Sequence, residues 1–334
     1  MRRKKLALEE SVGTLLAHDL TRVVPGEFKG VQFRQGHRIR EEDLELLRSM
    51  GKEHVWVLEL DPDEWHENDA ARRAAEAVAG KGIALGEARE GRVNLAARQA
   101  GLFVVDVEGV HAWNAHGDVM VVTKANEVRV RAGERVAAVK VIPLAVREAD
   151  LAERLAQGPL LDVLPFQPKR VRMVTTGREV YTGRIQDAFR PKVAPKVEAL
   201  GGLFLGQEIV PDEVEAVAGA IGRALEDADV VLVTGGMSVD PDDVTPRAIA
   251  ESGVAVEVQG TPVLPGAMFL LGYRGPKVVL GLPASVIHEA LTIFDLIFPK
   301  VMAGLRPSRA DILRMGVGGL LEPCPTCGTS PLSL

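Results

Sequence analysis

The sequence has few aromatic residues, a single pair of cysteines and no long apolar run. Aromatic residues make up 4% of its 334 residues, and Trp56, Trp65 and Trp113 are too scattered to form a stacking platform for nucleic-acid bases. Cys324 and Cys327 form one C-x₂-C pair, which gives no disulfide framework and supplies only half of a tetrahedral zinc site. No stretch approaches the roughly 20 apolar residues that a membrane-spanning helix requires.

Charge is mildly acidic overall but uneven along the chain. The formal net charge of −6 argues against nucleic acid or an anionic membrane as the main partner. The apolar stretch after the basic N-terminus is too short for a secretory signal, so we expect a cytoplasmic protein. Between Lys169 and Lys196, however, eight basic residues face two acidic ones. This basic window is either a candidate anion site or a solvated basic face.

Periodicity predicts four parts. Residues 1–65 are typical of a small α+β module, because a leucine-rich helical segment is followed by the strand-like "HVWVL". An Ala-rich helix and short β-branched segments predict a β-rich module over residues 66–150. Residues 165–306 alternate strand, loop and helix, which indicates an α/β domain. Residues 307–334 are predicted to be a tail, with its cysteine pair either functionless or part of a metal site shared across a dimer.

The α/β part has apolar runs without polar alternation, the pattern of parallel strands that are covered by helices on both faces. We therefore predict a doubly wound, mostly parallel sheet. The predicted strands span residues 169–177, 203–210, 229–236, 254–260 and 276–284. The predicted helices span residues 187–202, 212–228, 245–253 and 285–304, the last as one long helix.

Three of these strands end in unusual loops, "TTGREVYTGRIQD", "TGGMSVDPDD" and "GLPAS", which should meet at the carboxyl edge of the sheet. Adjacent glycines at 235 and 236 let backbone N–H groups approach an anion, and the hydroxyl of Thr234 or Ser238 adds a donor. The alternative is an ordinary Gly-Gly turn.

Aspartates gather beside this turn. Asp240, Asp242 and Asp243 follow it directly, and carboxylates next to an anion-binding loop suit a divalent cation that bridges them to phosphate. The competing interpretation is N-capping, of the helix near Val244 by Asp242 or Asp243, and of the preceding helix by Asp212.

Together these segments, from about residue 168 to 305, resemble the molybdopterin-binding domain shared by molybdopterin adenylyltransferases and molybdopterin molybdenumtransferases. The matching positions are Thr176, Gly177, Glu179, Gly183, Ile185, Asp187, Asp212, Gly235, Gly236, Ser238, Val239, Asp243, Pro265, Gly266, Leu282 and Pro283. The upstream modules more distantly resemble the accessory modules of the molybdenumtransferase branch. No match to the C-terminal barrel of that branch follows.

The chain departs from the family pattern in three loops. Asp240 stands where the family has glycine, Ala267 and Met268 replace a lysine-proline pair, and Ala284, Ser285 and Val286 replace Gly-Asn-Pro. The lost lysine removes a cation from the place where an anionic ligand would lie.

The resemblance implies a protein that binds molybdopterin or its adenylylated form in molybdenum cofactor biosynthesis. Asp212 and Asp243 would then be the catalytic pair, which holds Mg²⁺ and positions molybdate for insertion. Alternatively, the protein is a non-catalytic binding or maturation factor that serves a molybdoenzyme. The family's modular arms also imply a homodimer. The implied ligand-binding residues are Thr176, Gly177, Glu179, Asp187, Thr234, Gly235, Gly236, Ser238, Pro265, Gly266, Pro283 and Ser285.

Overall fold

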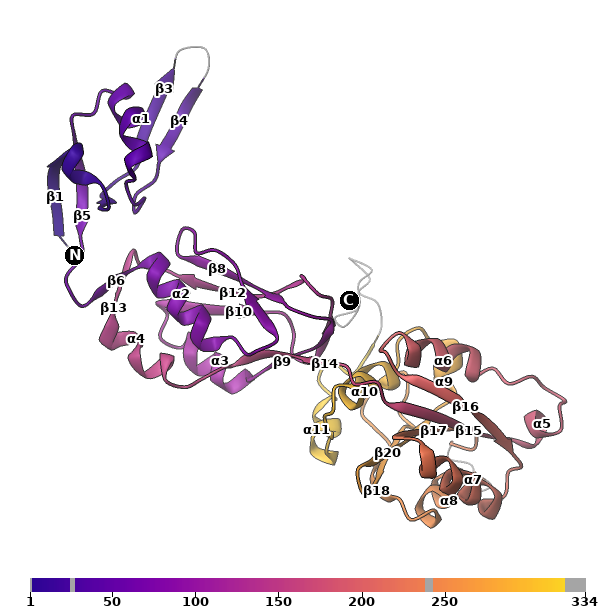
Figure 1. Ribbon diagram of the computed structural model, residues 1–334. Helices are drawn as coiled ribbons and strands as arrows, with labels where there is room; N and C mark the ends of the chain where they lie inside the picture. The colour runs from indigo at the N-terminus through magenta and orange to yellow at the C-terminus, as the bar shows by residue number, and fades with distance from the viewer. Residues whose placement is uncertain (1, 25–27, 238–242, 322–334) are drawn as a thin grey trace. The chain divides into compact units, whose positions relative to one another are not determined.

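A computed structural model describes residues 2–24, 28–237 and 243–321 (Figure 1). The chain divides into two compact units. The first contains most residues up to Val163, and the second begins at Leu164 and also takes in residues 100–102 and 127–129. No helix within the described ranges combines the length and apolar character that crossing a bilayer requires.

The first unit begins with a small antiparallel sheet and a hairpin. The sheet has the strand order β1-β5-β2, and β3 pairs with β4. In β5 the side chains of Val55 and Val57 are buried while Trp56 is 47% exposed, which is the alternation of a half-covered strand. Leu47 of α1 packs into the same core. The elements are β1 (Arg2–Ala7), η1 (Glu9–Ser11), β2 (Leu15–Leu16), β3 (Leu20–Val24), β4 (Phe28–Phe33), η2 (Glu41–Asp43), α1 (Leu44–Ser49) and β5 (His54–Glu59).

The rest of the first unit is rich in short strands, as predicted. Its sheets have the orders β10-β12-β8-β7, β11-β9-β14 and β13-β6. The Ala-rich α2 buries Ala70, Ala71, Ala74 and Ala75 completely, because small side chains allow close approach to the strands. The elements are β6 (Glu64–His66), α2 (Glu67–Val78), β7 (Ile83–Leu85), β8 (Arg92–Ala97), β9 (Gly101–Val105), α3 (Val107–Asn114), β10 (Val119–Thr123), β11 (Val128–Val130), β12 (Arg135–Val141), β13 (Ala145–Arg147), α4 (Glu148–Leu155) and β14 (Leu161–Pro165).

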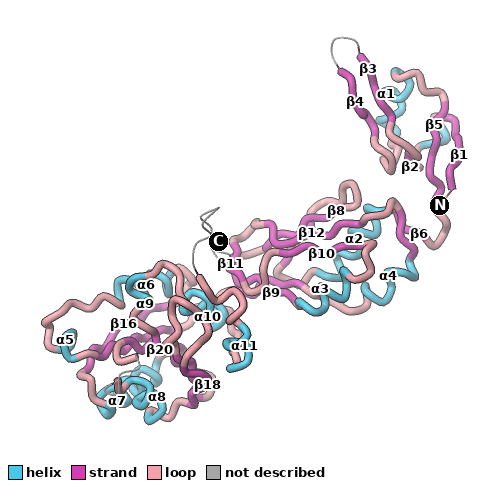
Figure 2. The backbone as a smooth tube through the Cα atoms, turned by 180° about the vertical axis from the view of Figure 1, so that it is seen from behind, coloured by secondary structure: helices cyan, strands magenta, loops and turns pink. Residues whose placement is uncertain are grey.

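The second unit contains one six-stranded sheet with the order β16-β15-β17-β20-β19-β18. Of these six strands, β19 runs antiparallel to both of its neighbours, β20 and β18, and the other five run in one direction, so the predicted mostly parallel α/β fold is confirmed. Helices α6, α9, α10 and α11 cover one face, and α7 and α8 cover the other, as Figures 1 and 2 both show. The elements are β15 (Arg170–Thr176), α5 (Arg178–Tyr181), α6 (Arg190–Glu198), β16 (Leu203–Val210), α7 (Val214–Asp227), β17 (Val230–Thr234), α8 (Thr245–Glu251), β18 (Ala255–Gln259), β19 (Leu270–Arg274), β20 (Lys277–Leu282), α9 (Ser285–His288), α10 (Ile293–Met302) and α11 (Arg309–Arg314).

The position of β17 inside the sheet explains its apolar sequence. All five of its residues are buried. Val230 and Leu232 belong to the core on the α6 and α10 face, whereas Val231 and Val233 belong to the core on the α7 and α8 face. A strand with helices on both faces has no position for a polar side chain until it ends. In β17 the polar residue is therefore the last one, Thr234.

Two predictions about secondary structure in this unit were wrong. The predicted single helix over 285–304 is two helices, because Thr292 and Asp295 form a capping box that starts α10 anew after α9 has ended. Strand β19 was not predicted. It lies antiparallel between β20 and β18, where the alternation of strand and helix is broken.

Arg154 of α4 is the most deeply buried charge in the first unit. Its side chain is 2% exposed and donates two parallel hydrogen bonds of 2.8 Å to the carboxylate of Asp118. These hydrogen bonds lower the pKa of Asp118 in the folded protein. The guanidinium also lies over the Trp113 ring, 5.5 Å from its centroid.

We predict that Asp118→Asn lowers the free energy of unfolding by about 3 kcal/mol, because it leaves a buried guanidinium without its counter-charge. The stabilisation by Asp118 is present above its unfolded pKa of about 3.9 and is lost as the pH falls through the lowered folded value. The difference between wild type and variant in urea unfolding should therefore shrink in acid. Asp150→Asn, an exposed change on α4, the helix that carries Arg154, should alter the stability by less than about 0.5 kcal/mol. An equal loss in both variants would contradict the prediction.

Candidate functional site

The three loops singled out in the sequence start side by side at one edge of the sheet. Thr175 of β15 pairs with Thr234 of β17, and Thr234 pairs in turn with Leu282 of β20. On the other side of β15, Thr176 pairs with Val210, the last residue of β16. The carboxyl ends of four parallel strands therefore form one edge, where α/β proteins bind their ligands.

The Gly235–Gly236 turn at the centre of this edge requires glycine. Both residues have positive φ, +88° and +52°. A Cβ on Gly235 would lie 2.0 Å from the carbonyl oxygen of Thr176, so no side chain fits there. The hydroxyl of Thr245 in α8 donates to the carbonyl of Gly235 at 2.8 Å and holds the turn from behind. The turn is thus fixed by backbone packing, and it presents backbone with no side chain at these two positions.

Asp212 and Asp243 converge on this turn. A Cβ on Gly236 would lie 3.3 Å from Oδ1 of Asp212 and 3.7 Å from Oδ1 of Asp243. The hydroxyl of Thr176 donates to Asp212 Oδ1 at 3.0 Å and fixes that carboxylate. Neither aspartate occupies an N-cap position, because Glu213 and Val244 are the N-cap residues of α7 and α8. The side chain of Asp212 therefore does not cap α7.

Two carboxylates beside a backbone turn suit a hydrated Mg²⁺ ion, which is often bound by one or two protein carboxylates together with water and phosphate oxygens. Within the ranges that the structure describes, no group of three or more His, Cys, Asp or Glu side chains could hold a metal. Asp212 and Asp243 are therefore the two described carboxylates beside the turn that could contribute to such a site.

Asp187 is held by the chain itself. Its carboxylate accepts hydrogen bonds from the backbone N–H groups of Phe189 and Arg190, at 3.1 and 3.0 Å, at the start of α6. The side-chain amide of Gln207 donates to it at 2.9 Å. Glu179, which the resemblance also implied as a binding residue, is exposed in α5. The loop between β15 and α6 therefore has a fixed end at Asp187 and an exposed middle.

The Pro265–Gly266 loop reaches the same edge by another route. Because β19 runs antiparallel to β20, the start of β19 lies beside the end of β20, with Leu270 opposite Gly281. Gly266 has φ +120°, and a Cβ on it would lie 2.5 Å from the Ile293 side chain. The loop that precedes β19 is thus pressed against the beginning of α10.

Pro283 and Ser285 follow β20 at this edge. Ser285 is the first residue of α9, and its Oγ is buried without a hydrogen-bond partner in the described part of the chain. Ser238, Asp240 and Asp242, like Cys324 and Cys327, lie outside the described residues.

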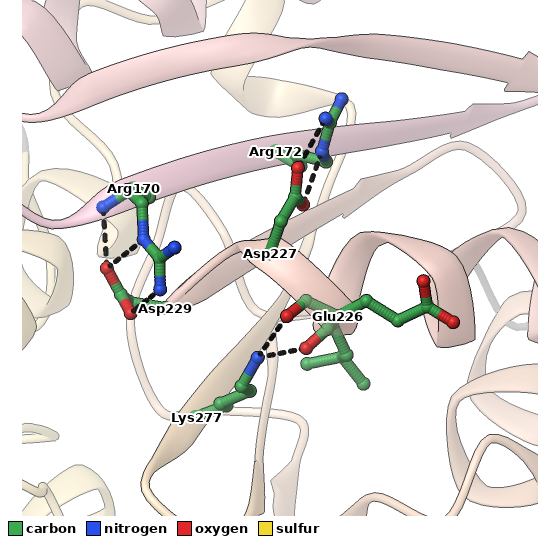
Figure 3. A network of polar contacts seen from close by, with 7 residues as sticks. Arg170, Arg172, Glu226, Asp227, Asp229 and Lys277 are labelled. Atoms are coloured by element: carbon green, nitrogen blue, oxygen red, sulfur yellow. Dashed lines mark hydrogen bonds and ion pairs between the residues drawn. The ribbon is translucent and has the colours of Figure 1, made fainter.

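The basic window does not form a single anion site. Arg170 pairs with Asp229 and Arg172 with Asp227, both at the amino end of β15 (Figure 3). Hydrogen bonds from these arginines lower the pKa of Asp229 and of Asp227. Lys277 donates to the backbone carbonyls of Leu225 and Glu226, in the last turn of α7. This network stabilises the end of a helix on the edge opposite the candidate site.

The remaining basic residues of the window are divided between other contacts and solvent. Lys196 pairs with Asp295 at 2.7 Å, and Arg190 lies over the Phe204 ring. Arg178 and Arg184 are exposed in the loop that follows β15, so this loop carries the positive charge nearest in sequence to the carboxyl edge.

Sequence reasoning missed three residues of the site, Thr175, Gln207 and Thr245. Thr175 shares a hydrogen bond of 2.8 Å with the buried hydroxyl of Thr234, Gln207 donates to Thr175 at 2.7 Å, and Thr245 holds the glycine turn. Thr175 and Gln207 lie within strands and Thr245 at the start of a helix. The one available signal was a polar residue inside an otherwise apolar strand pattern.

Most of the second unit is similar to known proteins. Residues 172–303 match the family described as a probable molybdopterin binding domain. These residues form a divergent member of that domain family. Residues 5–59 match a domain of unknown function, DUF8806.

Relatives of the molybdopterin-binding domain include proteins of several kinds. A protein of Pyrobaculum arsenaticum is 34% identical over 159 residues, which are 48% of this chain and 49% of that protein. A molybdopterin molybdenumtransferase of Nostoc sp. is 26% identical over 157 residues, 44% of this chain and 36% of that enzyme. The crystal structure of MoaB from Thermus thermophilus is 21% identical, with a TM-score of 0.34 over 42% of this chain and 99% of that one. The chain spans about half or less of the length of the curated relatives it matches.

We predict that Gly235→Ala destabilises the molybdopterin-binding domain by more than about 1 kcal/mol, the cost of left-handed backbone in a residue with a Cβ. The clash with the Thr176 carbonyl adds to this cost. Gly222→Ala is the matched control, because Gly222 lies in α7 with no atom within 4 Å of its added Cβ. The control should stabilise by about 0.5–1 kcal/mol through helix propensity. Urea unfolding distinguishes the two, and equal effects would contradict the prediction.

Proposed function

We propose that the domain binds molybdopterin or adenylylated molybdopterin at the carboxyl edge of its sheet, in molybdenum cofactor biosynthesis. The observation that carries this proposal is the convergence of Asp212 and Asp243 on the Gly235–Gly236 turn. Backbone N–H groups of a glycine turn suit phosphate oxygens, and paired carboxylates suit the cation that accompanies phosphate. The family match over residues 172–303 supports the identity of the ligand.

Each part of the edge has a proposed task. Asp212 and Asp243 would hold Mg²⁺, which would neutralise phosphate charge near the glycine turn. Thr176 orients Asp212 by its hydrogen bond, and Thr245 orients the turn. The loops at Pro265–Gly266 and at Pro283–Ser285 would contact the rest of the ligand.

Insertion of molybdate into the bound pterin is the second candidate function, and it is favoured by the same pair of aspartates. Against it stand Ala267 and Met268, which occupy the place of the lysine-proline pair of the family, so that the loop before β19 supplies no cation there. We therefore place binding, with delivery to a molybdoenzyme, ahead of insertion. A homodimer is the assembly that the resemblance favours.

Titration of the purified full chain with molybdopterin and with adenylylated molybdopterin, each with and without Mg²⁺, tests the proposal. We expect binding of at least one form, strengthened by Mg²⁺. Asp212→Asn and Asp243→Asn should each weaken binding about tenfold or more and abolish the effect of Mg²⁺, because each removes a charged metal ligand. Glu251→Gln, an exposed carboxylate that pairs with Arg247 on α8, is the control and should bind as the wild type does.

Failure of the wild type to bind either form would overturn the proposal. Turnover separates the two candidate functions. Conversion of adenylylated molybdopterin and molybdate by the wild type, with loss in both aspartate variants, would establish insertion. Binding without turnover would establish the binding factor.

A further inference from the structure

A chain of hydrogen bonds runs beneath the candidate site. The hydroxyls of Thr175 and Thr234 are 2.8 Å apart and almost completely buried between β15 and β17. The side-chain amide of Gln207, on the neighbouring strand β16, donates to Thr175 Oγ1 at 2.7 Å and to Asp187 Oδ2 at 2.9 Å. Three adjacent strands are thereby connected to Asp187, which lies three residues before the start of α6 at Arg190.

The chemistry of these groups fixes their orientation. An ionised carboxylate only accepts hydrogen bonds, so the group of Gln207 that faces Asp187 must be the NH₂ end. Both amide hydrogens are then used, one on Thr175 and one on Asp187. No other uncharged side chain donates two hydrogens from one nitrogen except asparagine, whose side chain is one methylene shorter. The bridge is therefore specific to glutamine at this position.

Asp187 ends the loop that begins at Gly177 and carries the exposed residues Arg178, Glu179 and Arg184. The start of this loop is fixed by β15, where Thr176 bonds Asp212. Its end is fixed by Asp187, through two backbone N–H groups and Gln207. Among the contacts of the Asp187 carboxylate, only the one with Gln207 ties it to the sheet, since the other two belong to the start of its own helix.

We propose that Gln207 is a positioning residue of the site. It ties the Asp187 end of the loop to the buried threonine pair and so sets the place of the exposed arginines relative to the glycine turn. The proposal rests on the proposed function, because the exposed arginines matter only if an anionic pterin binds at this edge.

The test uses the full chain with Gln207→Leu and Gln207→Glu, and Gln259→Leu and Gln259→Glu as controls on the exposed face of β18. Amide hydrogen exchange of residues 178–189 is measured without ligand, and affinity for molybdopterin and its adenylylated form is measured by titration. We expect Gln207→Leu to speed exchange in the loop and to weaken binding, each about tenfold, as loss of a hydrogen bond to a charged group does. The Gln259 variants should match the wild type in both measurements.

Gln207→Glu adds a readout that a general loss of structure would not change. Its carboxyl group faces the carboxylate of Asp187, and two like charges at this distance disfavour double ionisation. At about pH 8 the pair should repel and release the loop, whereas at about pH 5 the protonated glutamic acid should donate to Asp187 as the amide does. The ratio of variant to wild-type affinity should therefore rise as the pH falls.

The outcomes separate this inference from the proposed function. Absence of pterin binding by the wild type would refute the proposed function, while loop exchange would still show whether Gln207 fixes the loop. Wild-type binding with unchanged exchange and affinity in Gln207→Leu would refute the positioning role. A Gln207→Glu ratio that is constant with pH would refute it also.

Discussion

The close approach of two strand ends is the constraint on which the site depends. Gly235 lies so near the Thr176 carbonyl that a Cβ would overlap it. This approach brings the ends of β15 and β17 together, and it lets Thr176 turn its hydroxyl to Asp212 while Thr175 meets Thr234. Because helices cover both faces of the sheet, these polar groups have no other place than the strand ends.

The fold of the second unit could be predicted because parallel strands leave a clear pattern. The apolar runs of β17 and β20 and the intervening helical segments specified a mostly parallel sheet. Strand β19 escaped prediction because it carries the same apolar character but breaks the alternation with helices. The division between α9 and α10 depends on a capping box whose residues, Thr292 and Asp295, also fit an uninterrupted helix.

The loop residues of the candidate site could be predicted, because glycine and aspartate stand out in the sequence. Contacts that form only when strands pair could not be predicted. Gly235, Gly236, Asp212 and Asp243 lie in loops with recognisable composition, and in the structure they lie close together. Gln207 and Thr175 are 32 positions apart in the chain and meet only because β15 and β16 pair in one register. The sequence left two interpretations of the basic window open for a related reason. A strand that starts with arginines places them at the edge opposite its glycine loop.

Charged side chains are therefore satisfied in different ways at the amino and the carboxyl ends of the parallel strands. At the amino edge, arginines and aspartates neutralise one another, and a lysine satisfies the end of α7. At the carboxyl edge the aspartates differ in what satisfies them. Asp187 accepts three N–H groups of the chain, whereas Asp212 accepts one hydroxyl bond from Thr176, with most of its accepting capacity left over. A carboxylate already filled by its own chain serves to hold a loop in place. A carboxylate fixed by a single bond, and aimed at a bare backbone turn, is suited to a cation brought in by a ligand.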